Sequence, residues 1–196
     1  MGKIENNSIF APKTKLMPTD ELILELFSNE NTRNRAFEML VKKYQREVYQ
    51  SVRRMVGLHD DANDVSQNVF IKIWRHLDNF RGESSLKTWI LRICTNESLT
   101  FIEKRKKLLN LTDDSHTEWM LQTIPDDKYI SSDQIVQLIQ QAILHLPEKQ
   151  RVVFSLRYYD EMPYEEMSKV LNTSEGALKA SYHFAVKKVE DFLLNH

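Results

Sequence analysis

Apolar side chains recur with helical spacing through the middle of the chain. Between residues 60 and 80 they lie four positions apart, which places them on one face of a helix. A second helical pattern covers residues 86–107 and ends in the basic run Lys104–Lys107. The short segment between them contains Gly82, which is flexible, and Ser85, which can cap the second helix. The pattern therefore predicts two helices that hold a polar loop between them; the apolar positions are Val65, Val69, Ile73 and Leu77, then Leu86, Trp89, Ile90 and Ile93.

Two further helices are predicted before this stretch. A short one begins at Asp20-Glu21, after Pro18-Thr19. A longer one follows Asn31-Thr32, carries an apolar stripe from Phe37 to Val56, and is closed by Gly57. Together the four helices form one predicted helical domain, residues 19–107.

The helical pattern returns in the last third of the chain and predicts a second domain, residues 134–196. Pro147 separates its first two helices, and Met162-Pro163 opens a short third helix that ends at Leu171. After a turn at Asn172-Thr173, Ser174 caps a long last helix. A short helix, a tight turn and a long amphipathic helix make the helix-turn-helix pattern, although ordinary helical hairpins share it.

Residues 108–133 carry no sustained period and form a predicted acidic linker. They contain six acidic residues and one lysine, whereas residues 81–107 contain seven Lys and Arg against three Glu. The apolar residues Trp119, Met120 and Leu121 favour a linker that docks on a partner, and a disordered tether is the alternative. With an overall net charge of −1, the chain should bind DNA weakly alone and better inside a larger positive assembly.

Composition supports an all-α fold, because the chain has only four Gly and five Pro. The single cysteine, Cys94, cannot form an internal disulfide and is expected to be a buried thiol, which fits a cytoplasmic protein. No apolar run approaches the roughly 18 residues that a membrane span needs, and the first residues lack the apolar core of a signal peptide.

No catalytic or metal-binding pattern is present in the sequence. The six histidines form no HExxH or paired-ligand spacing, and there is no phosphate-binding GxxxxGK[ST] loop. Cys94 has no placed base that would make it a nucleophile. We therefore expect a protein that is not an enzyme and needs no cofactor.

The central stretch resembles the second conserved region of bacterial sigma factors, in the compact extracytoplasmic-function (ECF) group. The resemblance rests on several spaced motifs: Asp61 to Phe70, Phe80-Arg81-Gly82, Thr88 to Ile93, and Asn96. Residues 146–190 resemble the fourth conserved region of the same group, through Leu146-Pro147, Gln150-Arg151, Phe154, Tyr164 to Met167, Gly176, Leu178-Lys179 and Ala185. The two regions occur in the right order with an acidic linker between them, which is the ECF architecture.

The resemblance implies a protein that binds core RNA polymerase, recognises promoter DNA at two elements, and traps an unpaired base to begin melting. An anti-sigma factor is a further candidate partner. The residues implied for core polymerase are Asp61, Asp64 and Gln67, which should form an exposed acidic face. Those implied for the minus-ten element are Phe80, Arg81, Gly82, Glu83, Ser84, Ser85, Lys87, Asn96, Lys104 and Arg105. Those implied for the minus-thirty-five element are Ser174, Lys179, Ser181, His183 and Lys187.

Each of these assignments has a structural alternative. Asp61 and Asp64 could simply stabilise a helix N-terminus, and the basic run at Lys104 could be a solvated helix end. Asn96 could bond only within its domain, although its amide offers the donor and acceptor that a base edge needs. Family members usually have Glu at the position of Asn68 and often Arg at those of Ser181 and Phe184, so some contacts typical of the family are missing here.

Two other functions remain to be compared with the sigma interpretation. A stand-alone helix-turn-helix regulator would use only the second domain on DNA, and the motifs of the first domain argue against it. A helical protein that only sequesters a partner would need neither Asn96 nor Lys179. A gel shift with and without core polymerase separates a sigma factor from a stand-alone regulator.

Overall fold

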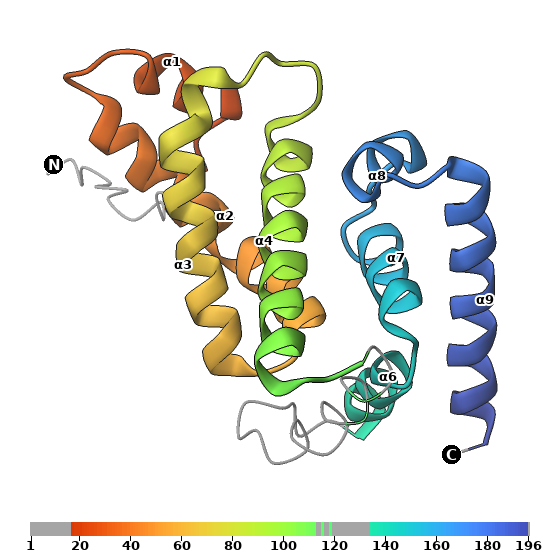
Figure 1. Cartoon of the computed structure of the whole chain (residues 1–196). Helices are drawn as coiled ribbons and strands as arrows, with labels where there is room; N and C mark the ends of the chain where they lie inside the picture. The colour runs from red at the N-terminus through yellow and green to blue at the C-terminus, as the bar shows by residue number, and fades with distance from the viewer. Residues whose placement is uncertain (1–16, 113–114, 116–117, 119–133, 196) are drawn as a thin grey trace, which may run out of the picture. The chain divides into compact units, whose positions relative to one another are not determined.

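The computed structural model describes residues 17–112, 115, 118 and 134–195, and every regular element in these residues is helical (Figure 1). The all-α prediction is therefore confirmed. The chain divides into two compact units, residues 1–43 and 44–196. The elements are α1 (Asp20–Phe27), α2 (Arg33–Val56), α3 (His59–His76), the 3-10 turn η1 (Leu77–Asn79), α4 (Leu86–Leu109), α6 (Gln134–Leu144), α7 (Glu148–Tyr158), α8 (Tyr164–Leu171) and α9 (Glu175–Leu194).

In the first unit, α1 is capped and tied to the beginning of α2. The Thr19 side chain accepts a hydrogen bond from the Leu22 amide at 3.3 Å, which satisfies one free N–H of the first turn. Ile23 and Phe27 are buried, and the Arg33 guanidinium lies 4.1 Å from the Phe27 ring centroid. Lys43 bonds the Asp20 carboxylate at 2.7 Å. These contacts fix the short helix, which would be too short to persist alone.

In the second unit, α3 and α4 pack side by side (Figure 1). Gly57 precedes α3 with φ +91°, a conformation that glycine adopts without a steric penalty. Val65, Val69 and Ile73 are buried on α3, as their four-residue spacing predicted. Cys94 is fully buried on α4, and burial raises the pKa of its thiol well above the ordinary value, so the expectation of a buried thiol is confirmed.

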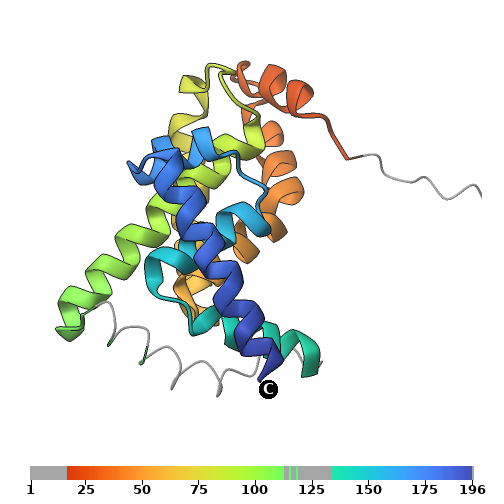
Figure 2. The same ribbon diagram turned by 90° about the vertical axis from the view of Figure 1, so that its right-hand side faces the viewer.

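Helices α6, α7 and α8 all pack against α9, the long helix in the blue part of the chain (Figure 2). The predicted helix-turn-helix is confirmed as α8, a turn and α9. Asn172 ends α8 in the left-handed region at φ +47°, and the Ser174 side chain accepts a hydrogen bond from the Ala177 amide at 3.3 Å. The buried side of α9 is Leu178, Ala185 and Val189.

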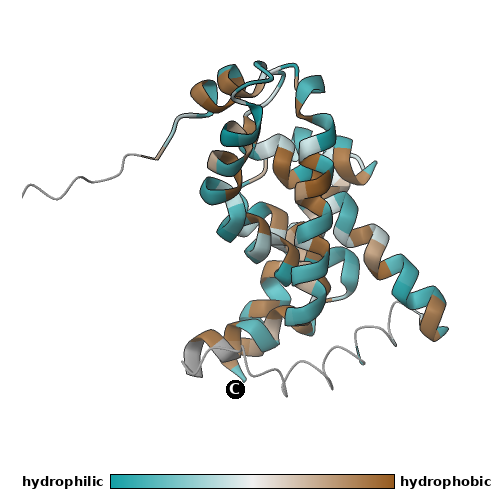
Figure 3. Cartoon of the chain, turned by 90° about the vertical axis from the view of Figure 1, so that its left-hand side faces the viewer, coloured by the Kyte–Doolittle hydropathy of each residue, from teal (hydrophilic) through white to brown (hydrophobic). Residues whose placement is uncertain are grey.

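Figure 3 shows hydrophilic and hydrophobic positions alternating around most helices, as amphipathic helices require. No helix in the described ranges is both long enough and apolar enough to cross a membrane. Of the predicted linker, residues 108–109 extend α4 and Asn110 caps it in the left-handed region. Its acids Asp113, Asp114, Asp126 and Asp127 and its apolar residues Trp119, Met120 and Leu121 lie outside the described residues.

Burial predicts which isoleucines of the α3–α4 pair hold the fold. Ile90 on α4 is 1% exposed, whereas Ile71 on α3 is 47% exposed. Ile90→Ala should lower the free energy of unfolding by about 2–5 kcal/mol, because it removes buried methylenes and leaves a cavity. The matched change Ile71→Ala should stay within about 0.5 kcal/mol. Urea titrations followed by circular dichroism measure both, and equal losses would contradict the placement of these side chains.

Candidate nucleic-acid interface

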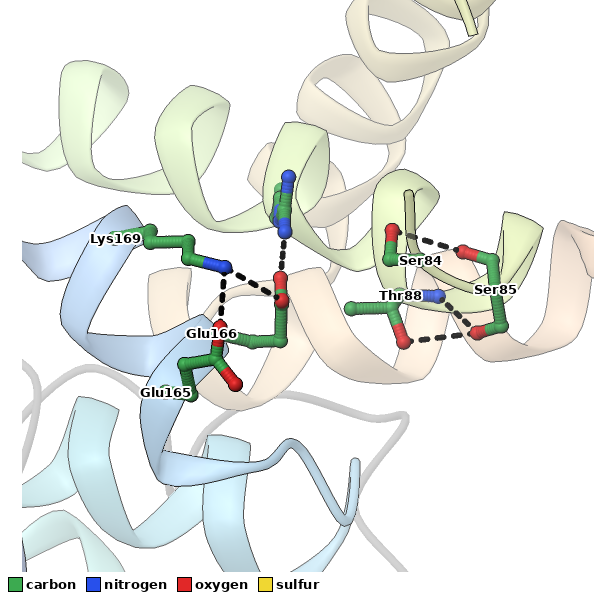
Figure 4. Close-up of polar contacts among 7 residues, drawn as sticks. Ser84, Ser85, Thr88, Glu165, Glu166 and Lys169 are labelled. Carbon is green, nitrogen blue, oxygen red and sulfur yellow. Dashed lines mark hydrogen bonds and ion pairs between the residues drawn. The ribbon is translucent and has the colours of Figure 1, made fainter. Parts of the chain in front are cut away.

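The loop between η1 and α4 has a defined conformation at both ends. Ser85 caps α4, since its hydroxyl oxygen accepts a hydrogen bond from the Thr88 amide at 3.0 Å and lies 2.8 Å from the Thr88 hydroxyl (Figure 4). At the other end, Phe80 packs edge-to-face on Trp89, with ring centroids 5.7 Å apart. Gly82 has φ +74°, where a side chain would be strained.

Most side chains of this loop point to solvent. Arg81, Glu83 and Ser85 are exposed, and Ser84 is half-buried with its hydroxyl 3.4 Å from the Ser85 carbonyl. The loop thus presents polar groups on a backbone fixed by a glycine turn, a helix cap and an aromatic contact. Such a surface can bind a nucleic-acid strand without being reorganised first.

Asn96 is exposed on α4, but it does not lie beside the loop. It comes ten residues after Leu86, which is about 15 Å along the helix axis. Its backbone carbonyl accepts a hydrogen bond from the Thr100 hydroxyl at 2.7 Å. Lys87, nearer the loop, lies 3.7 Å from Glu47 in an exposed pair. These groups therefore lie one after another along the axis of α4, from the loop through Lys87 to Asn96. They do not surround one pocket.

The structure brings together two residues that the sequence assigned to different partners. Arg105, expected at DNA, donates two hydrogen bonds to the carboxylate of Asp61, expected at polymerase, one of them at 2.7 Å. Their side chains are only 21% and 14% exposed. The expectation that Asp61 is exposed is therefore wrong, because a bidentate arginine covers most of its side chain. Asp64 and Gln67 are exposed, as expected.

The basic residues at the end of α4 differ in their exposure to solvent. Lys104 and Lys107 are exposed, whereas Lys106 is buried and bonds Glu148 of α7 at 3.1 Å. The interpretation of the whole run as a solvated helix end is therefore wrong for Lys106. Only part of the positive charge counted in the sequence is available to a phosphate backbone.

Helix α9 presents the residues expected at the minus-thirty-five element on its outer side. Ser174, Lys179, His183 and Lys187 are exposed, and Ser181 is half-buried. Lys179 bonds Glu175 at 3.2 Å, one helical turn earlier. Phe184, where the family often has arginine, is 55% exposed.

Sequence reasoning missed a cluster beside Lys179. The Tyr164 ring has the Lys179 ammonium 5.4 Å and the Arg157 guanidinium 5.1 Å from its centroid. A surface hollow at this cluster is lined by Arg157, Tyr164 and Tyr182. Burial raises the pKa of Tyr182. The three elements that meet here are α7, α8 and α9, so no local motif indicates the cluster. It adds Arg157 to the positive surface near the start of α9.

The described residues contain no group of three or more His, Cys, Asp or Glu side chains that could hold a metal ion. What the site offers is a capped loop, a helix with exposed amide and ammonium groups, and a separate helix-turn-helix. These are binding surfaces of the kind that contact phosphates and base edges.

Comparison with known families gives the class of protein that this fold and these surfaces define. Residues 40–108 match the family model described as Sigma-70 region 2, and residues 136–189 match Sigma-70, region 4. The protein is thus a transcription initiation factor with both sigma-70 regions. Within that class, the chain belongs to the ECF RNA polymerase sigma factors.

Two relatives define its place in the family. The chain is 35% identical over 156 residues to the ECF RNA polymerase sigma factor SigW of Bacillus subtilis, covering 76% of this chain and 83% of the relative. It is 28% identical over 181 residues to the ECF RNA polymerase sigma-E factor of Escherichia coli, covering 88% and 93%.

Two solved structures share the fold. One is the sigma factor RpoE in complex with the anti-sigma factor NepR from Bartonella quintana, with a TM-score of 0.62, 21% identity, and coverage of 80% of this chain and 96% of that one. The other is CnrH in complex with the cytosolic domain of CnrY, with a TM-score of 0.60, 20% identity, and coverage of 89% and 96%.

Family membership establishes the general function. The chain binds RNA polymerase and directs it to promoters in transcription initiation. A stand-alone helix-turn-helix regulator would leave the match of residues 40–108 to region 2 without an explanation.

The Asp61–Arg105 pair is expected to stabilise the α3–α4 packing. A double-mutant cycle with Asp61→Ala and Arg105→Ala should give a coupling free energy of about 0.5–3 kcal/mol, because both side chains are largely removed from water. The same cycle on the exposed pair Glu175 and Lys179 should give at most about 0.5 kcal/mol. Urea denaturation of the four variants in each cycle measures the coupling, and a coupling of zero at the first pair would contradict the contact.

Proposed function

We propose that residues 19–107 contact core polymerase and the minus-ten element, and that residues 134–196 read the minus-thirty-five element. The observation that carries this division is the fixed, exposed loop Phe80–Ser85 at the start of α4. It lies on a different part of the chain from α9, whose outer side carries Lys179, His183 and Lys187. Two separate polar surfaces suit two separate DNA elements.

Asp64 and Gln67 on α3 form the proposed contact with polymerase. Both are exposed, so they can meet a basic partner surface without rearrangement. Asp61 has a different role in this proposal, since Arg105 already neutralises it. Through its ion pair with Arg105 it holds α3 against α4. Its remaining exposed part lies at the edge of the proposed contact with polymerase.

Capture of an unpaired base is proposed for the loop and for α4. A base that leaves the stack needs an aromatic or apolar wall and hydrogen bonds to its edge. Phe80 is half-buried against Trp89, so part of its ring remains available. Arg81, Lys87 and Lys104 would follow the phosphates. Because Asn96 lies about 15 Å beyond the start of α4, it would contact a different nucleotide from the loop.

Recognition of the minus-thirty-five element is proposed for α9. Its capped N-terminus at Ser174 and the Lys179 side chain suit phosphate or guanine contacts. His183 and Lys187 lie one and two turns further along the exposed side. Ser181 is too short and too covered to replace an arginine, so this chain should depend more on Lys179 than its relatives with arginine do.

The remaining parts of the proposal concern partners and place. The two solved relatives of this fold are complexes with an anti-sigma factor and with the cytosolic domain of CnrY, which supports an anti-sigma partner here. The chain would act in the cytoplasm, where polymerase works. It would perform no reaction itself, since polymerase supplies the catalysis.

Charge reversal on α3 tests polymerase binding. Asp64→Lys should weaken binding to core polymerase by roughly 2 kcal/mol or more, since it turns an attractive interface charge into a repulsive one. Glu190→Lys, the same reversal at an exposed position of α9, should leave binding unchanged. Titration of labelled protein with purified core measures both affinities. Unchanged binding of Asp64→Lys would count against this surface.

Truncation at Asn96 tests the minus-ten assignment. Asn96→Ala should change the free energy of unfolding by no more than about 0.5 kcal/mol, because the side chain is exposed. It should weaken open-complex formation by about 1–3 kcal/mol, the usual effect of losing a good base contact. Permanganate footprinting with saturating polymerase measures promoter opening.

Two comparisons sharpen this experiment. Asn68→Ala removes the same amide from an exposed position of α3 and should open promoters at the wild-type rate. On a template with a pre-opened mismatch bubble, the Asn96→Ala defect should persist if Asn96 reads the base and shrink if it assists melting. Wild-type opening of duplex promoters by Asn96→Ala would make Asn96 a structural residue.

A further inference from the structure

The exposed side of α9 carries a short row of apolar residues. Ala177, Ala180 and Phe184 are three and four positions apart, so they lie on one face of the helix and form the apolar row. All three are exposed, and Phe184 is 55% exposed although its side chain is large and aromatic. The buried side of the same helix is Leu178, Ala185 and Val189. The apolar row is therefore not part of the core that holds α9 in place.

The position of the apolar row matters more than its exposure. A lone exposed phenylalanine is common on protein surfaces and needs no explanation. Phe184, however, lies on the second helix of a helix-turn-helix, the helix that enters the major groove of DNA in proteins with this motif. The whole row lies in the N-terminal half of α9, where such helices contact base edges. The Phe184 ring has the imidazole of His183 beside it, with centroids 6.0 Å apart.

Positively charged side chains border the apolar row. Lys179 and Lys187 follow one edge of it, Lys188 lies one turn after Phe184, and all three lysines are exposed. Exposed acids follow only beyond Lys188, at Glu190 and Asp191. Apolar residues between cations are a poor match for an apolar groove on a protein. They match the major groove of DNA, where base edges lie between two phosphate backbones.

The apolar row has no side-chain hydrogen-bonding group, and this decides which base it can recognise. In the major groove the apolar group that a base pair presents is the C5-methyl of thymine. Guanine presents two acceptors there, and cytosine presents an amino donor. A methyl group or a phenyl ring placed on these polar groups would remove their water without supplying a partner. Contact with the apolar row therefore favours thymine and disfavours a G·C pair at the same step.

The length and shape of the apolar row suit a few neighbouring base pairs. Ala177 and Phe184 are seven residues apart, which is roughly 10 Å along the helix axis, the length of about three base steps. A recognition helix brings its N-terminal residues closest to the bases. The two alanines near that end need little reach, whereas a residue further along the helix must reach further. Phe184 is the long side chain of the row.

We propose that Ala177, Ala180 and Phe184 recognise thymine methyl groups in the major groove of the minus-thirty-five element, with Phe184 making the contact that sets the preference. This inference rests on the function proposed for α9 and extends it by naming the bases. The preferred element contains A·T pairs over about three neighbouring steps. Lys179, held by Glu175 and beside the Tyr164 ring, binds phosphate or a guanine next to them.

The element is identified with the holoenzyme, core polymerase bound to the full chain. Heparin-resistant complexes are isolated from a pool of templates randomised over both promoter elements, and the bound templates are sequenced. The enriched minus-thirty-five element should contain these A·T pairs. Phe184→Ala should relax the preference at one step and leave the others. Lys187→Ala, which removes a neighbouring charge, should weaken binding to all sequences alike and lower its salt dependence.

Removing the methyl group alone tests the contact itself. In the enriched promoter, each thymine of the element is replaced in turn by deoxyuridine, which pairs as thymine does but lacks the C5-methyl. At the step that Phe184 contacts, this replacement should weaken wild-type binding about four-fold, the effect of returning one methyl group to water. The Phe184→Ala holoenzyme should bind both templates equally. Titration of labelled promoter with holoenzyme measures the affinities.

Phe184→Arg supplies the converse experiment. An arginine can donate two hydrogen bonds to guanine in the major groove. The variant should therefore prefer a G·C pair, by about ten-fold or more, at the step where the parent prefers thymine. Because Phe184 is exposed, neither substitution should lower the unfolding temperature, which circular dichroism checks.

The outcomes separate this inference from the function on which it rests. An enriched element without these A·T pairs, or an equal effect of deoxyuridine on wild type and Phe184→Ala, would overturn the thymine contact. So would a Phe184→Ala variant that loses affinity for core polymerase and keeps its sequence preference, since Phe184 would then contact a protein. If Lys179→Ala alters the upstream preference and Phe184→Ala does not, only the thymine contact fails. If neither variant alters it, the assignment of α9 to this element fails as well.

Discussion

The second unit depends on burying α4 on more than one side. Leu86, Ile90 and Ile102 are buried on a helix that packs along α3, and Leu91, next to Ile90, is buried under α7 and α8. Adjacent residues point about 100° apart around a helix, so no single stripe can include both. The helix therefore needs partners on two sides, and the capped loop before it takes its position from that double packing.

The same packing determines which charges remain for nucleic acid. Arg105 is paired with Asp61, Lys106 with Glu148, and Arg92 with Glu166. The overall net charge of −1 is set by composition, and these ion pairs leave fewer cations free than the sequence contains. Since phosphate binding depends on the number of free cations, the isolated chain should hold DNA weakly.

Local features of the fold followed from the sequence because they depend on near neighbours. The spacing of Val65, Val69 and Ile73 and the caps at Ser85 and Ser174 involve residues within a turn or two of each other. The pairing of Asp61 with Arg105 joins residues 44 positions apart, and that of Arg54 with Asp160 joins residues 106 apart. Helical periodicity carries no information about such pairs, so the partial burial of Asp61 could not be predicted from it.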